Sequence, residues 1–422
     1  MKTFCISAIA SNQGKTILTT ALLWHFRDSV RPFKIGPDFI DPQFHKQVCG
    51  TSSVNLDSFI MNEEQVSWMF RHYANKKVAV LEGVMGFYDG DNKGCSAYSV
   101  SKLLGIPTIL LLDGSGSYIT VSAVLGGLLS YKEGNTIQAV VLNNLSSKMH
   151  YALIKKQIEE DYPHIVVLGW IAKNLSSLKN THLGLDLKDL DKIAQISQEV
   201  LEHIALDKLS SLTTSEAKAS LPYNYPFSPI PTINKKLAIV NDSNFSFLYY
   251  DNLLFLQEVF REVVLIDATK NEVIPNDCDV VYLVGGYVET PNAYEKIKES
   301  THFKESLRQH AKEKVIYAEC AGLLYLSNCV DDKIMAGVLD IAFTLENRFN
   351  RLGYYYNEEG VKGHAFHYTK PTQETLEKGF NILSKVPQGK GVVGSWKKGK
   401  VLGTYLHTMF RNNPKILNHF IG

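Results

Sequence analysis

The sequence lacks an excess of either charge. Among its 422 residues, 44 Lys and Arg stand against 43 Asp and Glu, so the formal net charge is +1. Nucleic-acid-binding proteins normally carry a basic surface, and this balance gives no sign of one. The longest apolar run, around 103–112, is broken by Gly105 and Pro107 and is shorter than the ~18 residues that cross a bilayer. We therefore expect no nucleic-acid partner and no membrane span.

Paired cysteine motifs are also missing. None of the six cysteines forms a C-x-x-C pair, which argues against a zinc ribbon and against a disulfide scaffold. Hydrophobic residues make up 45% of the chain and charged residues 21%, the composition of a globular rather than a disordered protein. We expect a soluble, cytoplasmic protein, and at roughly 150 residues per domain the length predicts two or three domains.

Prolines mark a domain boundary. Residues 222–231 hold four of the chain's 14 prolines, and neither a helix nor a central strand can run through such a segment. Residues 210–220, just before it, are rich in Ser, Thr and Ala, as linkers often are. The sequence therefore predicts an N-terminal domain over 1–205, a Pro-rich linker over 206–235 and a C-terminal domain over 236–422.

Both predicted domains alternate short apolar runs with helical stretches. Continuous rather than alternating hydrophobicity indicates strands covered on both faces, so we expect two α/β domains with mostly parallel sheets. After residue 361 the pattern becomes turn-rich and favours antiparallel strands. The expected parallel strands are Thr3–Ile9, Val78–Glu82, Thr108–Asp113, Ala139–Asn143 and Val166–Ile171, then Leu237–Val240, Glu262–Ile266, Asp279–Val284 and Val315–Ala318.

A phosphate-binding loop is predicted between the first strand and a helix that begins near Lys15. Gly14, Lys15 and Thr16 supply a flexible position, a lysine for the phosphate oxygens and a hydroxyl for Mg²⁺. The usual first glycine of a P-loop falls on Ile9, so the strict pattern is not met. The placement after an N-terminal strand nevertheless favours ATP binding over a chance match.

Two further segments carry charges suited to ATP and Mg²⁺. Residues 34–42 concentrate a lysine, two carboxylates and two prolines in one rigid turn, and we expect Lys34 and Asp38 to neutralise phosphate or to position metal. Glu82 ends an apolar strand, and a carboxylate there, beside a P-loop, is where Mg²⁺ is normally held. The alternatives are a solvated loop and a strand-end Glu facing water. The predicted metal ligands are Thr16, Asp38 and Glu82.

A second candidate site centres on Cys320, where residues 315–322 run from an apolar strand into a helix. Small residues stand two positions away on either side, the arrangement of a nucleophile elbow. We expect the turn to expose the sulfur and the helix N-terminus to favour the thiolate over the thiol. The alternative is a buried core cysteine, which fits Cys329 well.

A thiolate nucleophile needs a base and an oxyanion hole. His407 follows the last predicted strand and is the expected base. Gly285 or Gly286, at the end of a strand, is expected to supply one backbone N–H to the oxyanion hole, and Ala321 the other.

One histidine pair has the spacing of a metal site, His364 and His367 in an H-x-x-H arrangement. No Cys or carboxylate at suitable spacing accompanies it, and alternate faces of a strand would separate the two rings. We therefore do not expect this pair to bind a metal.

These features together resemble the cobyrinic acid a,c-diamide synthases, glutamine amidotransferases of corrinoid biosynthesis. The shared features run from residue 5 to about residue 410, in the order that the family has them. The specific matches are Gly-Pro-Asp-Phe-Ile-Asp-Pro at 36–42 and Glu-Gly-Val-Met-Gly at 82–86, with support from Asn55–Asp57, Thr181–Leu185, Ala318–Leu323 and Gly363–Tyr368. The resemblance implies a dethiobiotin synthetase-like P-loop domain followed by a class I glutamine amidotransferase domain.

The resemblance also implies a reaction: amidation of the a and c carboxylates of cobyrinic acid, driven by Mg²⁺-ATP and by ammonia from glutamine. Cys320 would attack glutamine while His407 handles the protons. In class I triads a Glu stands two residues after the His, whereas Met409 stands here, as in the cobyrinate branch. The sequence does not identify what orients the imidazole. A homodimer is left open.

Other interpretations remain. Within the family, the substrate is alternatively another tetrapyrrole, such as nickel-sirohydrochlorin or hydrogenobyrinic acid, or the chain is a cobyric acid synthase, which is usually longer. Outside it, a P-loop ATPase switch with an interaction domain would explain the first half alone, but a switch needs no thiol nucleophile such as Cys320. A dethiobiotin synthetase-like carboxylation would leave the second half without a role.

Overall fold

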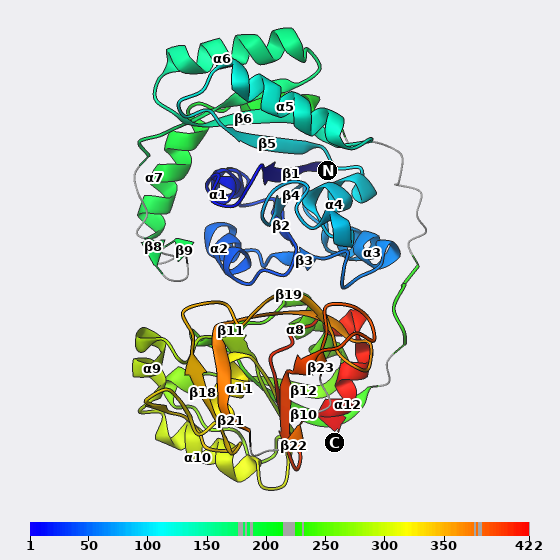
Figure 1. The fold of residues 1–422 in the computed structure, drawn as a ribbon, viewed down its shortest axis with the longest axis vertical. Helices are drawn as coiled ribbons and strands as arrows, with labels where there is room; N and C mark the ends of the chain where they lie inside the picture. The colour runs from blue at the N-terminus through cyan, green and yellow to red at the C-terminus, as the bar shows by residue number, and fades with distance from the viewer. Residues whose placement is uncertain are drawn as a thin grey trace. The chain divides into compact units, whose positions relative to one another are not determined.

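The chain forms two compact units in a computed structural model, Met1–Pro226 and Phe227–Gly422 (Figure 1). The predicted linker at 206–235 is described only in part. Within it, the 3-10 helix η2 (Leu206–Ser211) buries Leu209 in the core of the first unit, which therefore extends beyond residue 205. The structure describes residues 1–175, 180–181, 184–185, 189–213, 224–229, 232–374, 377–378 and 382–421.

The first unit is built on a seven-stranded sheet with the order β3-β2-β4-β1-β5-β6-β7, and all its pairings are parallel. All five strands predicted for this half are confirmed. Two more, β2 and β3, were not among the predicted strands. The bounds are β1 Lys2–Ala8, β2 Val30–Ile35, β3 Val54–Leu56, β4 Val78–Gly83, β5 Thr108–Asp113, β6 Ile137–Leu145 and β7 Val166–Ala172.

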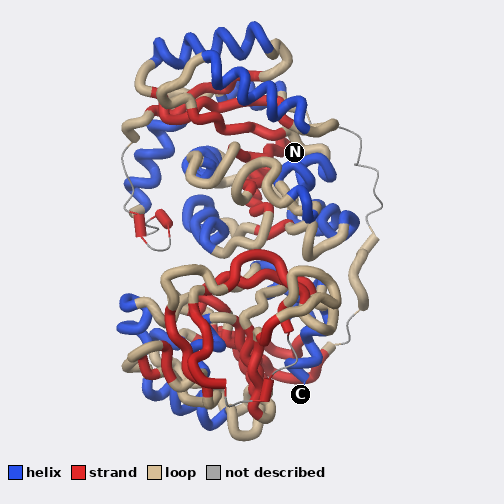
Figure 2. Tube along the Cα trace, in the orientation of Figure 1, coloured by secondary structure: helices blue, strands red, loops and turns tan. Residues whose placement is uncertain are grey.

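Helices cover both faces of this sheet (Figure 2). Apolar side chains of α1, α2 and α7 share one core with β1, β4, β5 and β6, and Figure 1 shows α3 and α4 on the opposite side of the sheet. The bounds are α1 Lys15–His25, α2 Ile40–Cys49, α3 Glu63–Tyr73, α4 Ala97–Leu104, α5 Ile119–Tyr131, α6 Lys148–Asp161 and α7 Leu190–Leu201. No helix in the described ranges combines the length and the apolar character needed to cross a membrane.

The second unit also contains a seven-stranded sheet, in the order β12-β10-β13-β15-β26-β25-β22. Its first five strands pair in parallel, and β25 and β22 continue antiparallel, as predicted for the C-terminal part. The α/β class predicted for both halves is confirmed. The bounds are β10 Ile233–Val240, β12 Phe260–Ile266, β13 Val280–Leu283, β15 Val315–Glu319, β22 Glu377–Lys378, β25 Ser395–Lys398 and β26 Val401–Thr404.

Smaller elements surround this sheet and position the second candidate site. The glycine pair forms its own short strand, β14 (Gly285–Gly286), antiparallel to β11 (Phe245–Phe247). A hairpin of β19 (Arg351–Tyr356) and β20 (Lys362–His367) carries both histidines of the H-x-x-H pair, His364 and His367. The helices are α8 Tyr250–Val259, α9 Pro291–Ile297, α10 Thr301–His310, α11 Ala321–Leu326 and α12 Asn418–Ile421, and β16 Cys329–Val330, β17 Lys333–Ile334, β18 Ile341–Leu345 and β21 Thr369–Glu374 form a separate sheet.

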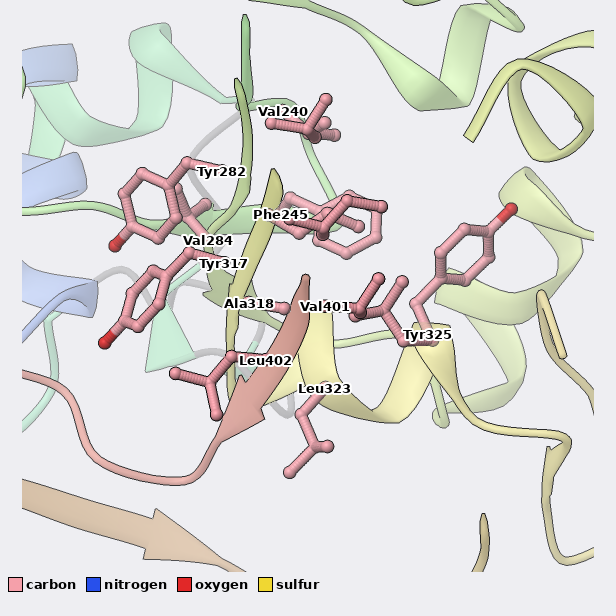
Figure 3. Close-up of a cluster of buried hydrophobic side chains, with 14 of the residues drawn as sticks. Val240, Phe245, Tyr282, Val284, Tyr317, Ala318, Leu323, Tyr325, Val401 and Leu402 are labelled. Carbon is pink, nitrogen blue, oxygen red and sulfur yellow. The ribbon is translucent and has the colours of Figure 1, made fainter. Parts of the chain in front are cut away.

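The core of the second unit surrounds the strand that leads to Cys320 (Figure 3). Tyr282 and Tyr317 project from neighbouring strands with their ring centroids 5.6 Å apart. Leu323, on α11, has no exposed surface, and a Cβ added to Gly403 would lie 2.5 Å from its Cδ1 atom. The elbow therefore stands on closely packed side chains.

Replacing Leu323 with alanine should lower the free energy of unfolding of the second unit by about 2–5 kcal/mol, because the cavity left in a packed core adds to the lost burial. Leu265→Ala is the matched control, since Leu265 is 51% exposed on β12 and should change stability by less than about 0.5 kcal/mol. Urea unfolding followed by circular dichroism measures both. Equal unfolding midpoints for the two variants would contradict the packing described.

Candidate active site

The first candidate site begins at the phosphate loop between β1 and α1. Gly14 takes a left-handed backbone conformation with a φ of 88°, and a Cβ there would lie 2.5 Å from Nδ2 of Asn143. The same Nδ2 donates a hydrogen bond to the Gln13 carbonyl at 2.9 Å, and so ties the loop to the end of β6. Asn12 is also left-handed, with a φ of 60°. Because Asn tolerates this conformation better than most residues, the loop turns with few glycines.

A cavity of about 630 Å³ opens at this loop. The structure brings all the predicted nucleotide and metal residues to its wall, although they come from three separate segments of the chain. The predicted residues that line it are Gly14, Lys15, Thr16, Lys34, Asp38 and Glu82. The Lys15 ammonium donates a hydrogen bond to the Ala10 carbonyl at 2.8 Å, which holds the lysine along the loop.

Glu82 is the electrostatic centre of the cavity. Its carboxylate is fully buried, accepts a hydrogen bond from Thr16 Oγ1 at 2.9 Å and lies 3.4 Å from the Lys34 ammonium. Burial acts to raise the pKa of Glu82, but Lys34, then His45 and Thr16, outweigh it and hold that pKa below its usual value. The carboxylate is therefore charged when the cavity is ready to receive a ligand.

Lys34 is surrounded by carboxylates. It contacts Asp41 closely and lies 3.5 Å from Asp38. Burial lowers the pKa of Lys34, but the charges of Asp41, Glu82 and Asp38 together raise it overall. The lysine thus stays protonated although its side chain is buried.

Two residues of this cluster were not among the predicted site residues, Asp41 and His45. His45 Nε2 lies 2.7 Å from Glu82 Oε2, and its Nδ1 lies 3.2 Å from Ser53 Oγ. Asp41 belongs to the 34–42 segment whose carboxylates were noted from the sequence. Nothing local marks His45, because only the packing of α2 brings it to a strand 37 positions away.

The oxygen ligands present fit Mg²⁺. This ion is usually held in proteins by one or two carboxylates together with phosphate oxygens rather than by a complete protein cage. The Thr16 hydroxyl and the Glu82 carboxylate, 2.9 Å apart, offer such a set, and Asp38 lines the same cavity. In the described ranges, no group of three or more His, Cys, Asp and Glu is arranged as a protein-only metal site.

The second candidate site contains Cys320 at the turn between β15 and α11. Its backbone adopts a φ of 46° and a ψ of −103°, a conformation that a non-glycine residue rarely takes. The Cys320 N–H donates to the Thr404 carbonyl at 2.8 Å, so the turn is anchored to β26. The strand–turn–helix geometry lies where the sequence predicted an elbow.

The expectation that the turn exposes the sulfur is wrong, and the helix N-terminus does not suffice to make the thiolate the favoured form. Cys320 is only 7% exposed, and burial raises the pKa of its thiol well above the usual value, with the Glu289 carboxylate as the next cause. Backbone hydrogen bonding to Ala321 and Gly286 acts in the opposite direction but does not prevail. Because α11 has six residues, its dipole is short, and desolvation outweighs it.

His407 is oriented by a residue that the sequence did not identify. Its Nδ1 lies 3.1 Å from Oε2 of Glu319, the residue before Cys320, and both side chains are buried. Pairing of β15 with β26 sets Glu319 opposite Thr404, three positions before His407. The other oxygen, Oε1, accepts a hydrogen bond from the Tyr317 hydroxyl at 3.3 Å. The Glu319 carboxylate therefore holds the His407 ring, although Glu319 stands elsewhere in the chain than position 409, where class I triads have a Glu.

The neighbours of His407 leave its ring little freedom. The backbones of His364 and His407 exchange two hydrogen bonds of 2.9 Å, and the two rings stack with centroids 5.1 Å apart. Burial, then the charge of His407, lowers the pKa of His364 well below its usual value. A Cβ added to Gly285 would lie 2.3 Å from His407 Cε1, so only glycine fits beside the ring.

The two histidines of the H-x-x-H pair contact different neighbours. His367 Nδ1 lies 2.8 Å from the Thr369 carbonyl, and its ring stacks on Tyr405 with centroids 3.5 Å apart. His364 faces His407 instead, with the Tyr249 hydroxyl 3.2 Å from its Nδ1. The pair therefore does not converge on one point.

Comparison with known proteins covers both halves of the chain. The model of the CobB/CobQ-like glutamine amidotransferase domain matches residues 236–415. A cobyrinate a,c-diamide synthase of Listeria monocytogenes serotype 4b (strain F2365) is 31% identical over 456 residues, covering 100% of this chain and 99% of the relative. The chain belongs to the cobyrinate a,c-diamide synthase family.

Other members of this family are similar over most of their length. The cobyrinate a,c-diamide synthase of Fusobacterium nucleatum subsp. nucleatum is 34% identical, covering 88% of this chain and 89% of the relative. The one of Saccharolobus solfataricus is 32% identical and covers 98% of both chains. Membership makes the chain an amide-forming ligase with a glutamine amidotransferase domain. Of the segments that carry the resemblance, 181–185 lies partly outside the described residues.

The contact between Glu319 and His407 can be tested through the rate of glutamine hydrolysis. Glu319→Gln should lower kcat/KM for glutamine hydrolysis about 100-fold or more, because the imidazole loses the charge that fixes its tautomer. Ammonia-dependent amidation should stay unchanged. Tyr317→Phe is the control: it removes one hydrogen bond to the same carboxylate and should cost less than about tenfold. Full glutaminase activity of Glu319→Gln would show that glutamine hydrolysis does not depend on this contact with the His407 imidazole.

Proposed function

We propose that the chain amidates the a and c carboxylates of cobyrinic acid, consuming one ATP and one glutamine for each amide. The observation that carries this proposal is the presence of two separate sites in one chain. One is a phosphate-loop cavity and the other a Cys-His pair, each in its own unit. Relatives named cobyrinate a,c-diamide synthase match over the whole chain, and their name supports cobyrinic acid as the substrate.

In the second unit, His407 takes the proton of the Cys320 thiol, and the sulfur attacks the side-chain amide carbon of glutamine. Backbone N–H groups of Ala321 and Gly286 hold the oxyanion that forms, in agreement with their hydrogen bonding to the sulfur. The C–N bond breaks, His407 returns the proton to the leaving nitrogen, and ammonia departs from a γ-glutamyl thioester. Water then hydrolyses the thioester to glutamate and restores the thiol.

In the first unit, an oxygen of the substrate carboxylate attacks the γ-phosphorus of ATP, and ADP leaves. Activation is needed because a carboxylate is a poor electrophile. Ammonia then attacks the acyl carbon, phosphate leaves with both electrons of the C–O bond, and the nitrogen gives up one proton to water. Lys15 and the loop N–H groups bind phosphate oxygens, and Lys34 adds a positive charge beside them. Mg²⁺ held by Thr16, Glu82 and Asp38 would supply further neutralisation of phosphate charge.

Product mass tests the substrate directly. The protein is incubated with Mg²⁺-ATP, glutamine and cobyrinic acid, and the product is followed for zero, one or two acid-to-amide changes. Two changes are expected. Parallel reactions with sirohydrochlorin, its nickel complex and hydrogenobyrinic acid test the other tetrapyrroles. Amidation of one of these, with none of cobyrinic acid using either glutamine or ammonia, would overturn the corrinoid assignment.

A further inference from the structure

Glu289 is a carboxylate of the second unit to which the proposed chemistry gives no role. It lies three residues after Gly286, between the oxyanion strand β14 and the start of α9. Its Oε2 accepts a hydrogen bond from the Val288 N–H at 2.9 Å, and the Tyr287 N–H donates to the Asn244 carbonyl at 2.8 Å. The loop that carries Glu289 is thus fixed to the same strands that form the oxyanion hole.

The loop that carries Glu289 begins next to the reactive sulfur, because the backbone of Gly286, three residues earlier, hydrogen-bonds to Cys320. After burial, the Glu289 carboxylate is the largest cause that raises the pKa of the Cys320 thiol. A negative charge at this place disfavours the thiolate that the reaction needs.

Glu289 has little positive charge to balance it. Within the described ranges no Lys, Arg or His comes within 4 Å of its carboxylate, and burial raises the pKa of this group. Lys333 lowers this pKa, but its ammonium pairs with Asp332 at 3.3 Å and does not come within 4 Å of the Glu289 carboxylate. A partly buried carboxylate without a cationic neighbour is a suitable place for a cation brought by the substrate.

Glutamine brings such a cation. When its side-chain amide carbon is at the sulfur, two methylene groups separate that carbon from Cα, so the α-ammonium lies roughly 5 Å from the amide carbon. We propose that Glu289 binds the α-ammonium group of glutamine and thereby selects this substrate over amides that lack it. Binding of the ammonium neutralises the carboxylate, so the thiol is released from the charge that opposes its ionisation only when glutamine is bound. This inference rests on the proposed glutaminase site.

The test compares two amides in the glutaminase reaction of the full chain. One is glutamine, and the other is glutaramate, which is glutamine without its α-amino group. Glu289→Gln should lower kcat/KM for glutamine about 30-fold or more, because an ammonium–carboxylate hydrogen bond is lost, and should leave glutaramate hydrolysis unchanged within about threefold. Glu289→Asp should restore part of the preference for glutamine. Glu295→Gln is the matched control, because Glu295 is an exposed α9 residue paired with Lys298 at 2.7 Å.

An equal fall for both amides would overturn the inference, because it would show that Glu289 acts on the thiol or on the fold. An unchanged preference for glutamine would overturn it as well. Ammonia-dependent amidation by Glu289→Gln reports separately that the variant is folded. If cobyrinic acid is not amidated even by the unmodified chain, the proposed overall function fails, while the comparison of the two amides still decides the role of Glu289.

Discussion

Cys320→Ala is expected to abolish glutamine-dependent amidation and to leave ammonia-dependent amidation intact. Without the sulfur no thioester forms, and losses on removing a catalytic nucleophile are commonly about 10⁴-fold or more. The first unit retains its cavity, because Cys320 lies in the other compact unit. Amide formation with glutamine and with an ammonium salt, measured side by side by product mass, gives both values.

Cys329→Ala is the matched control for this experiment. Cys329 begins β16, where it is half-buried and has no elbow geometry, so its loss should change neither reaction by more than about threefold. Loss of both the glutamine and the ammonia reaction in Cys320→Ala would contradict the division of labour between the two units.

Lys15→Ala is expected to show the opposite pattern: amide formation lost with glutamine and with ammonia, and glutamine hydrolysis retained. The lysine lines the phosphate cavity, and removal of a preorganised charge at a transferring phosphoryl group typically costs about 10²–10³-fold. Burial, then the Lys34 charge, lowers the pKa of Lys15, and the negative charge of a bound phosphate would act in the opposite direction.

Phosphate release and glutamate release are measured in the same reaction mixtures for this variant. Lys46→Ala is the control, since Lys46 is exposed on α2 and does not line the cavity. Amidation by Lys15→Ala at the rate of the unmodified chain would mean that this cavity does not bind the reacting phosphate.

Most of the sheet strands could be predicted because they are buried on both faces and read as continuous apolar runs, as β4 and β5 do. The strand β2 escaped this criterion since Arg31, Pro32 and Lys34 interrupt its apolar residues. Arg31 is nevertheless buried, with its Nε donating to the Tyr73 carbonyl at 3.1 Å, and Lys34 is balanced by carboxylates. Such buried charges depend on partners from elsewhere in the chain, which a local pattern does not contain.

In the candidate sites, too, local features could be predicted from the sequence, whereas contacts between distant residues could not. Local sequence places Lys15 after a strand and Cys320 on a turn, and the structure has both there. The contact between Glu319 and His407 joins residues 88 positions apart and exists only because β15 pairs with β26. The protonation of Cys320 depends on how many groups bury it and on the charge of Glu289. Neither is visible in the helix that follows the cysteine.

The central claim is that the substrate carboxylate is activated by phosphorylation before ammonia reaches it. Positional isotope transfer tests this claim most directly. Cobyrinic acid labelled with ¹⁸O in its a and c carboxylates is converted with Mg²⁺-ATP and glutamine, and the released inorganic phosphate is analysed by mass. If the carboxylate oxygen attacks the γ-phosphorus, one phosphate is released for each amide formed, and each of these phosphates carries one ¹⁸O atom. Phosphate without ¹⁸O, released while amides form, would contradict the account.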